Sequence, residues 1–418
     1  MSKRENLHKY ENQTSVCEKC GIFVDTDVVE ENKVVYFIKH CPHCGSHKTK
    51  ICIDARYYQA SLISDFHFLH CDDSKIKRVK GCPYDCGICE HHRQKVCMAM
   101  VETTDDCDIL CTTCIASSCP GGKKYISLYD LQSIIDTVKR LQGNVDLLML
   151  SGGEPAIHPQ IFELLDLCRK ANVKHTMLIT NGVKIAHDEV FVKKLAERKK
   201  GIEIYLQFDS LRNSSLLDIR GNDVSEELRR KAVYNLEKYG IHYTLVCVIK
   251  KGVNDTEIKE ILDFALAQKY ARGVTFQPLK DIGRGSVYNK EANYLTLSDL
   301  RHLIGKSGHI PLNEMIPHPC NGTCISIGYL AKDRTPITNY LYSQFENREI
   351  LKELMYYLPY LDTEEIKYDE LLRISVVSFL DKYNFTLNAV KRCCICFVYP
   401  NGKIVPFDTH YVYHNENI

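Results

Sequence analysis

Three cysteines in one short loop form the chemically most reactive pattern of this sequence. Cys107, Cys111 and Cys114 stand in a C-x3-C-x2-C spacing. Thiolates this close can hold three irons of a cubane iron–sulfur cluster, while the fourth iron has no obvious protein ligand. An iron with an open coordination position is a place for chemistry. The alternative is a closed cluster or a zinc site, in which Cys119, followed by Pro120, supplies a fourth ligand.

A glycine turn follows this cysteine loop, one predicted helix later. It is formed by Ser151, Gly152, Gly153, Glu154 and Pro155. Residues 99–104 predict a strand that enters the cysteine loop, and Ser127 with Asp130 forms a capping pair at the start of a helix. Residues 146–150 predict a buried strand that ends in the glycine turn. Because a strand, a crossover helix and a parallel strand bring both loops to the same edge of a sheet, we expect the loop and the turn to be neighbours.

The pattern of strand then helix repeats beyond the glycine turn. Further strands are predicted at residues 175–180, 202–208, 242–249 and 274–276. Amphipathic segments that predict helices lie between them, at residues 162–170, 226–239 and 256–268. Together with the first two strands, these make about six βα units. The predicted fold class is therefore α/β, a partial TIM-like (βα)6 barrel rather than a closed eight-fold one.

Polar side chains stand where the predicted strands end, at the mouth of the barrel. The candidates for contacts with ribose, adenine or substrate are Asn181, Gln207, Asp209 and Gln277. Each of them could instead cap a turn. Arg220 and Arg284 are weaker candidates for binding an anionic group of a ligand.

Two C-x2-C pairs near the N-terminus predict a zinc-ribbon or rubredoxin-like module. They flank a strand-like run at residues 34–38 and comprise Cys17, Cys20, Cys41 and Cys44. Four thiolates at tetrahedral corners suit Zn²⁺ or a single iron, and the sequence does not separate the two metals. A closed metal that only holds the fold is favoured over a redox role.

A second C-x3-C-x2-C motif lies between this ribbon and the barrel. Cys82, Cys86 and Cys89 form the motif, and Cys97 follows it. Four thiolates close a cluster, and no Gly-Gly-Glu turn stands at the right distance behind this motif. We interpret it as an auxiliary [4Fe-4S] cluster that could relay electrons. A second zinc site is the alternative.

The C-terminal third holds two more cysteine groups. Cys320 and Cys324 form one pair, and Cys393, Cys394 and Cys396 form a group far along the chain. If the two groups meet in the fold, they could bind a third cluster over the mouth of the barrel. The spacing of these cysteines does not by itself predict that the two groups meet.

The composition is consistent with an enzyme of more than one domain, since 418 residues exceed what one core usually accommodates. We divide the chain into a metal ribbon at 1–55, a connector with the auxiliary motif at 56–98, the barrel at 99–295 and an α+β auxiliary region at 296–418. The 54 basic and 53 acidic residues create no field that would steer the chain to nucleic acid or to an anionic membrane. The 21 cysteines, the polar first residues and the lack of an apolar run of roughly 20 residues predict a cytoplasmic protein without a transmembrane segment.

The cysteine loop and the glycine turn together resemble the radical S-adenosylmethionine (AdoMet) superfamily, whose hallmark is C-x3-C-x2-C followed by Gly-Gly-Glu after the second strand. The resemblance implies that Cys107, Cys111 and Cys114 ligate a [4Fe-4S] cluster whose open iron is chelated by AdoMet. It also implies that the glycine turn meets the methionine amino group. One electron from such a cluster cleaves the sulfonium to a 5′-deoxyadenosyl radical, which calls for a reducing partner such as ferredoxin or flavodoxin.

The order of all these parts resembles one family more closely, the tetraether lipid synthases with their archaeal pterin-methylating relatives. The shared parts include the thiolate ribbon, both cysteine motifs, a Leu-Gln-Phe-Asp strand at 206–209, Phe-Gln-Pro at 276–278 and the C-terminal cysteines. The resemblance implies three [4Fe-4S] clusters and one mononuclear metal. One departure stands at Asp408, where the family usually has cysteine. The third cluster would then use the C-terminal cysteines in another combination, or be absent.

These observations lead us to expect a radical AdoMet enzyme that abstracts hydrogen from a substrate C–H bond, for carbon–carbon bond formation on a lipid-like substrate. The alternative is a radical methylase of a pterin or another small molecule. An electron-transfer protein with several closed clusters would leave the βα repeats and the glycine turn unexplained. A zinc scaffold for RNA or protein fits the N-terminal cysteines, but the near-zero net charge gives it no phosphate-binding footprint.

Overall fold

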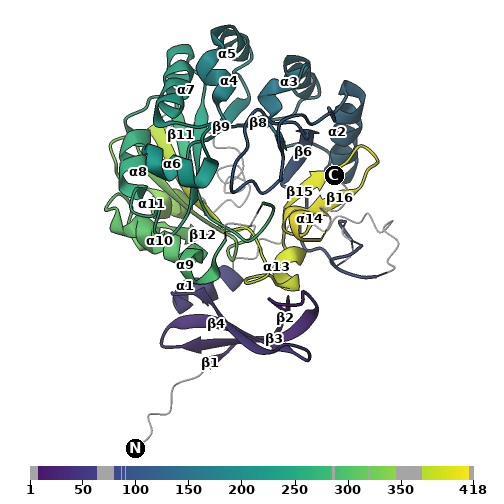
Figure 1. Ribbon diagram of the computed structural model, residues 1–418, viewed down its shortest axis with the longest axis vertical. Helices are drawn as coiled ribbons and strands as arrows, with labels where there is room; N and C mark the ends of the chain where they lie inside the picture. The colour runs from purple at the N-terminus through teal and green to yellow at the C-terminus, as the bar shows by residue number, and fades with distance from the viewer. Residues whose placement is uncertain are drawn as a thin grey trace, which may run out of the picture.

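The described part of the chain forms a small antiparallel sheet and a large mixed sheet (Figure 1). The computed structural model describes residues 8–63, 80–85, 87–89, 91–284, 288–318, 321–344 and 370–413. The five-stranded sheet near the N-terminus lies at one end of the molecule, and the eleven-stranded sheet curves away from it. Helices cover the outer side of the curved sheet (Figure 1).

The small sheet is built from hairpins that carry the N-terminal cysteines on their turns. Its strands are β1 (His8–Lys9), β2 (Gln13–Val16), β3 (Phe23–Glu31), β4 (Val34–Cys41) and β5 (Gly45–Cys52). Asn32 and Lys33 join β3 to β4 with positive φ angles of 52° and 68°, as a two-residue hairpin turn requires. The helix α1 (Ala55–Ile63) then leads away from the sheet, and Val35 and Phe37 join the main core.

The centre of the large sheet is the predicted partial barrel. Its parallel strands lie side by side in chain order: β6 (Met98–Thr104), β7 (Leu147–Gly152), β8 (His175–Thr180), β9 (Ile202–Gln207), β10 (Tyr243–Ile249) and β11 (Ala271–Pro278). The intervening helices are α2 (Leu128–Gln142), α3 (Ile161–Lys170), α4 (Val183–His187), α5 (Glu189–Ala196), α6 (Asn213–Arg220), α7 (Glu226–Tyr239) and α8 (Ile258–Leu266). Ser127 and Asp130 cap α2 reciprocally, as predicted. The predicted α/β partial barrel with an N-terminal ribbon is thus confirmed.

The C-terminal strands extend both edges of the barrel sheet. β14 (Leu371–Val377) pairs in parallel with β11, and β13 (Ile325–Ala331) and β12 (Ile316–Pro317) continue that edge. At the other edge β15 (Ile395–Val398) pairs in parallel with β6, and β16 (Ile404–Pro406) follows. The remaining helices are α9 (Lys290–Asn293), α10 (Leu297–Lys306), α11 (Thr338–Gln344), α13 (Leu387–Lys391) and α14 (Phe407–Tyr413). The region after residue 295 therefore completes the sheet of the barrel, while the domain boundaries themselves stay predictions.

The two faces of the barrel sheet pack against different partners. Outward residues such as Leu148 and Leu150 pack with the helices in the main core. Inward residues such as Met149 and Met177 pack instead with Phe407 and other aromatic residues of the C-terminal region. This part of the interior wall is therefore apolar and contains flexible thioether side chains that adapt to irregular shapes.

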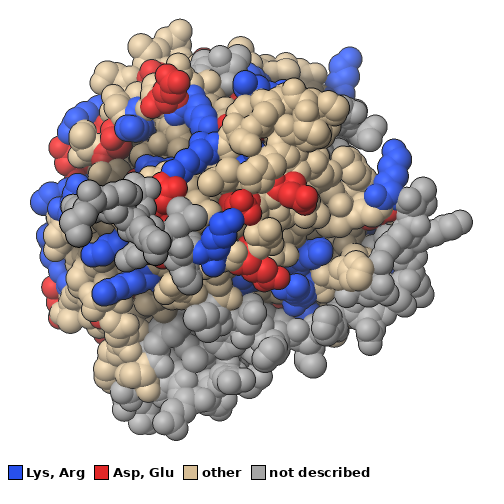
Figure 2. Space-filling model, turned by 90° about the horizontal axis from the view of Figure 1, so that it is seen from below, with Lys and Arg blue, Asp and Glu red and all other residues tan. Residues whose placement is uncertain are grey.

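Charged side chains of both signs are interspersed on the face shown in Figure 2. This agrees with a formal net charge of +1. Among the helices of the described ranges, none combines the length and the apolar character that crossing a bilayer requires.

Candidate active site

One cavity inside the barrel collects most of the predicted site residues. Its volume is about 300 Å³. It is lined in part by Cys107, Cys111, Cys114, Gly152, Gly153, Glu154, Asn181, Gln207, Arg220 and Gln277. The cysteine loop and the glycine turn are thus neighbours, because they follow the paired parallel strands β6 and β7. Cys119 is exposed and does not line this cavity, although its backbone lies beside Asp106.

The turn after β7 needs glycine because it lies against the backbone of the cysteine loop. A Cβ atom at Gly153 would be 1.9 Å from the carbonyl oxygen of Asp106. At Gly152, where φ is +117°, a Cβ atom would be 2.3 Å from the carbonyl oxygen of Thr104. The N–H of Gly153 donates to Thr104 O at 2.6 Å, and the N–H of Glu154 donates to Asp106 O at 2.7 Å. The turn therefore fixes where the cysteine loop starts.

A second glycine segment braces the far side of the cysteine loop. A Cβ atom at Gly283 would be 2.3 Å from the carbonyl oxygen of Ile115. The guanidinium of the next residue, Arg284, donates to the carbonyl oxygens of Cys111 and Ser118. This geometry corrects the prediction that Arg284 binds an anionic ligand group, because its donors are directed at the loop and hold it in place.

The Glu154 carboxylate is buried beside the cysteine loop. Its oxygens accept the backbone N–H groups of Asn181 at 2.6 Å and of Ala156 at 2.9 Å. Burial raises the pKa of Glu154 to about 7, although both N–H groups act in the opposite direction. Near neutral pH the group therefore holds its proton part of the time. A cationic group of a ligand beside it would favour the carboxylate form.

Hydrogen bonds within the protein orient the side-chain amides of Asn181 and Gln207 at the strand ends. The Asn181 side chain donates to Asp108 at 2.6 Å, and its oxygen accepts the N–H of Val183 at 2.9 Å. The same amide nitrogen lies 4.0 Å from the sulfur of Cys107. The Gln207 amide donates to Asp209 at 2.7 Å, which leaves its oxygen for the cavity.

Asp209 is the centre of a buried ion pair and does not line the cavity, and its role as a ligand contact stays a prediction. Its carboxylate accepts from the guanidinium of Arg220 at 2.8 and 2.9 Å and from the N–H of Val248 at 3.0 Å. A second guanidinium, that of Arg229, lies 3.5 Å away. Burial opposes ionisation, but the charge of Arg220 holds the pKa of Asp209 below its ordinary value.

Arg220 is a fixed cation beside the cysteine loop. Burial disfavours its charge, but Asp209 raises its pKa above the ordinary value, and the thiol of Cys111 interacts with it as well. Burial raises the pKa of the Cys111 thiol, and Arg220 counteracts this and favours the thiolate, the form that binds metal. Because Arg220 also lines the cavity, it could pair with a ligand carboxylate bound next to the cysteines.

The cavity also contains a polar patch that our sequence interpretation missed. We define it as Tyr205, Thr275, Arg373 and Ser375, all of which line the cavity. The guanidinium of Arg373 donates to the Tyr205 hydroxyl at 3.0 Å, and the hydroxyls of Thr275 and Ser375 are 2.9 Å apart. The signal that could have revealed the patch is the alternation of polar residues, Thr275 then Gln277 in β11 and Arg373 then Ser375 in β14.

A buried carboxylate anchors this polar patch. Glu203 is fully buried and accepts from Arg373 at 3.3 Å and from His175 at 3.1 Å. Burial opposes its charge, but Arg373 and then His175 lower the pKa of Glu203 to about 2. The carboxylate therefore stays ionised and holds Arg373 in place at the cavity wall.

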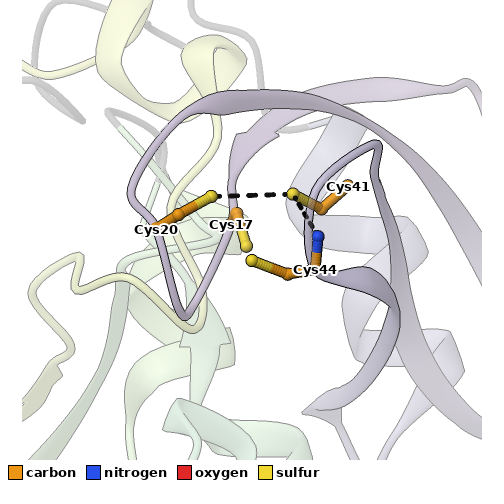
Figure 3. Close-up of side chains that lie close together, drawn as sticks. All are labelled: Cys17, Cys20, Cys41 and Cys44. Carbon is orange, nitrogen blue, oxygen red and sulfur yellow. Dashed lines mark hydrogen bonds between the residues drawn. The ribbon is translucent and has the colours of Figure 1, made fainter.

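The N-terminal ribbon brings its four cysteines together (Figure 3). The sulfurs of Cys17, Cys20, Cys41 and Cys44 all lie within 4.8 Å of one another, and those of Cys20 and Cys41 are 3.6 Å apart. Tetrahedral zinc with Zn–S bonds of about 2.3 Å requires sulfur–sulfur distances of about 3.8 Å. The N–H of Cys44 also donates to the sulfur of Cys41 at 3.3 Å. The four thiols thus fit one mononuclear metal.

The structure describes only some of the predicted auxiliary and C-terminal cysteines. Cys86 and Cys320 lie outside the described residues. Cys97 and Cys394 line the cavity, and the N–H of Cys97 donates to Cys394 O at 2.8 Å. Cys89 precedes them in a loop, and the side chain of Cys82 packs against the cluster that contains Cys324. Cys393 and Cys396 are both buried and close together, with the Cys396 sulfur 3.9 Å from Cys393 O, but Cys396 packs into the main core and does not line the cavity.

Comparison with known proteins agrees with this arrangement. Residues 76–265 match the Radical SAM superfamily, and residues 9–53 match the HMPTM N-terminal zinc ribbon domain. The chain is 26% identical to 7,8-dihydro-6-hydroxymethylpterin dimethyltransferase of Methanocaldococcus jannaschii, over 97% of this chain and 94% of that protein. It is 28% identical to GTP 3′,8-cyclase of Clostridium botulinum (strain Hall) over 48% of this chain and 62% of the cyclase.

Among solved structures, that of Streptococcus suis SuiB bound to S-adenosylmethionine matches with a TM-score of 0.49 and 16% identity, over 77% of this chain and 62% of that one. Radical SAM enzymes need AdoMet and a [4Fe-4S] cluster. The three cavity cysteines and the closely packed glycine turn fit this requirement. The chain therefore carries a radical SAM domain at residues 76–265, preceded by a zinc ribbon at residues 9–53.

Proposed function

We propose that this enzyme abstracts hydrogen from a carbon of a pterin-sized heterocycle, as a step in methylating it. The similarity to the pterin dimethyltransferase extends over nearly the whole of both chains, including the zinc ribbon. The observation that carries the proposal is the cavity itself, in which the three cysteines, the fixed cation and the polar patch face one small space.

The lining of the cavity offers both polar and apolar contacts to a small heterocyclic substrate. The polar patch presents donors and acceptors in fixed positions, which suits the ring nitrogens and carbonyl of a heterocycle. The methionine-rich wall offers apolar contact for the ring faces and helps to exclude water.

The residues of the cavity divide into those for AdoMet and those for substrate. We place the cluster on Cys107, Cys111 and Cys114, where bound AdoMet is cleaved by one electron to methionine and a 5′-deoxyadenosyl radical. Arg220 would pair with the methionine carboxylate of AdoMet. The negative charge of the Glu154 carboxylate would attract the positively charged amino group of the same methionine. These roles place the methionine end of AdoMet between the cysteine loop and the ion pair.

The electron must come from outside the barrel. A low-potential carrier such as ferredoxin or flavodoxin in the cytoplasm would supply it, and the auxiliary cluster predicted at Cys82, Cys86, Cys89 and Cys97 would relay it. Cys97 lines the same cavity as the three loop cysteines, which supports a relay role for that cluster.

The lipid-coupling interpretation stays a prediction with one observation in its favour. The apolar wall formed by residues such as Met100, Met149 and Met177 could contact alkyl chains. The polar patch in the same cavity weighs against an entirely apolar substrate. A pure electron-transfer role would leave the polar patch and the glycine turn without a purpose.

Anaerobic assays with deuterated substrates test the proposal. The reconstituted, reduced enzyme is incubated with AdoMet and 7,8-dihydro-6-hydroxymethylpterin that carries deuterium on its carbons. We expect deuterium in 5′-deoxyadenosine and a methylated pterin by mass spectrometry. The proposal would be contradicted if deuterium reached 5′-deoxyadenosine from a deuterated long-chain ether lipid and not from the pterin.

A pair of variants separates the two parts of the cavity. Arg373→Met removes the charged donor of the polar patch, so label transfer from the pterin should fall roughly 10- to 100-fold, the value of one charged hydrogen bond. The dissociation constant of AdoMet should stay within about two-fold of the parent. Arg212→Met, at an exposed ion pair, is the matched control and should change neither quantity.

A further inference from the structure

A second cavity lies where the small sheet meets the C-terminal part of the large sheet, and we call it the junction cavity. Its volume is about 260 Å³, far more than the roughly 10–15 Å³ that one bound water needs. Its walls include residues of the small sheet and of α1, α10 and α13, which lie close to that sheet in Figure 1. Among the described residues, none lines both the junction cavity and the cavity inside the barrel. The junction cavity is therefore a separate site.

The segment that follows β14 separates the two cavities. Val377 and Phe379 line the cavity inside the barrel, whereas Ser378 and Leu380 line the junction cavity. Successive side chains thus face opposite sides of one segment, and the two cavities lie on either side of it. A ligand of the junction cavity would sit behind the wall of the barrel cavity.

The charged residues of the junction cavity are mostly basic. Lys280, Arg392 and Arg93 line it, together with a single carboxylate, that of Glu11. Lys280 is 5% exposed and Arg392 is 7% exposed, whereas Arg93 and Glu11 are exposed. The two buried charges of the wall are therefore both positive.

The ammonium of Lys280 forms no hydrogen bond or ion pair with any of the residues that the structure describes. Its Nζ lies 5.7 Å from the ring centroid of Tyr294, which also lines the cavity. The carboxylate of Asp381 attracts it from beyond ion-pair distance and accepts backbone N–H groups instead, those of Tyr383 at 3.0 Å and Asp281 at 3.3 Å. Burial lowers the pKa of Lys280, so an anion bound beside it would favour its charged form. Its three donors can all serve a ligand.

Two buried hydroxyl groups of the same wall also have no partner within the described ranges. They belong to Tyr58, which is 7% exposed, and Ser378, which is 3% exposed. Buried polar side chains are nearly always hydrogen-bonded to protein, water or a ligand. Because both hydroxyls line the junction cavity, their partner would be a molecule inside it.

We propose that the junction cavity binds a small molecule through a phosphate group that pairs with Lys280 and Arg392 and accepts hydrogen bonds from Tyr58 and Ser378. Lysine and arginine are ordinary phosphate ligands, and a phosphate group carries close to two negative charges near neutral pH. This charge matches the two buried cations. The rings of Tyr58 and Tyr294 offer contact for the apolar part of the ligand. The proposal does not depend on the substrate of the cavity inside the barrel.

Isothermal titration calorimetry with phenyl phosphate tests the proposal. The full-length protein is titrated without AdoMet, at an ionic strength held constant with chloride. Phenyl phosphate supplies both the anion and a ring, and we expect one molecule bound per chain. Benzoate has the same ring but a single negative charge, so it should bind at least about 10-fold more weakly because it pairs with only one of the two cations.

Four variants locate the bound anion. Lys280→Met should weaken the binding of phenyl phosphate about 10- to 100-fold, the value of one charged hydrogen bond, and Ser378→Ala about 2- to 10-fold. Lys259→Met removes an exposed lysine of α8 that lines neither cavity, so it is the matched control and should leave the affinity within about two-fold of the parent. Arg373→Met, in the wall of the barrel cavity, should leave it equally unchanged.

Several results would overturn the proposal. They are no binding to the parent, equal affinity for benzoate, and an affinity for phenyl phosphate that Lys280→Met leaves unchanged. Weaker binding in Arg373→Met but not in Lys280→Met would place the anion in the barrel cavity instead. Equal circular dichroism confirms that each variant has folded. Should Lys280→Met fail to fold, Ser378→Ala decides, and an unchanged affinity in that variant contradicts the proposal.

Discussion

The buried ion pair between Asp209 and Arg220 offers a strong test of the fold around the site. We consider the substitution Asp209→Asn. It removes the charge that two guanidiniums share, those of Arg220 and Arg229, while it keeps nearly the same shape. The variant therefore leaves two buried positive charges without their counterion.

The size of the effect follows from the burial and the geometry of the pair. Both side chains are almost completely buried, and two hydrogen bonds of 2.8 and 2.9 Å join them. Removal of one partner from a buried pair costs about 3–5 kcal/mol, because the other charge stays uncompensated. We expect Asp209→Asn to lower the free energy of unfolding by that amount, a large part of the total stability of a typical domain.

Urea unfolding followed by circular dichroism measures this change. The matched control is Glu260→Gln, which breaks the exposed pair with Arg212 at 2.7 Å and should cost less than about 1 kcal/mol. A loss for Asp209→Asn no larger than that of the control would refute the reasoning. If the variant were as stable as the parent but bound AdoMet more weakly, Asp209 would be a ligand contact after all.

Three further predictions concern the glycine turn, Glu154 and the ribbon. Gly153→Ala should cost about 1–3 kcal/mol in urea unfolding and lower the iron content, since its Cβ would collide with Asp106. Gly252→Ala, where a Cβ has no neighbour but φ is +78°, should lose stability through backbone strain and keep its iron. The folded protein binds the proton of Glu154 more tightly than the unfolded chain, so the contribution of Glu154 to stability should be complete below pH 4.5 and be lost, by about 3 kcal/mol, as the pH rises through about 7. The difference in unfolding free energy between the parent and Glu154→Gln should therefore change by that amount in urea titrations over this pH range, and a constant difference would contradict the assignment. Cys41→Ser should lose about one zinc per chain by elemental analysis and increase hydrogen exchange in residues 8–52 but not in the barrel, and full retention of zinc would argue against the site.

Much of the fold could be predicted because its signals are local. The strand before the cysteine loop, the cap at Ser127 and the buried strand before the glycine turn each depend on a few neighbouring residues. The ribbon cysteines likewise lie in pairs on hairpin turns. The contact between loop and turn then follows from the geometry of parallel strands.

The parts that could not be predicted depend on contacts between distant segments. β14 and β15 join opposite edges of the sheet after long connections, and no local pattern specifies which strand each will pair with. The ion pair of Asp209 is one example, because its partner Arg220 belongs to another element and no local pattern joins the two. Arg373 meets Tyr205 across more than 160 residues, so its place in the cavity is visible only in the structure.

The central claim is that the cluster held by Cys107, Cys111 and Cys114 keeps one iron open for AdoMet. The most direct measurement is the formation of 5′-deoxyadenosine from AdoMet by the reconstituted, dithionite-reduced protein, compared between Cys111→Ala and Cys119→Ala. We predict that Cys111→Ala abolishes the product and that Cys119→Ala, at an exposed position outside the cavity, leaves it at the level of the parent. Unchanged product in Cys111→Ala, or its loss in Cys119→Ala, would contradict the account.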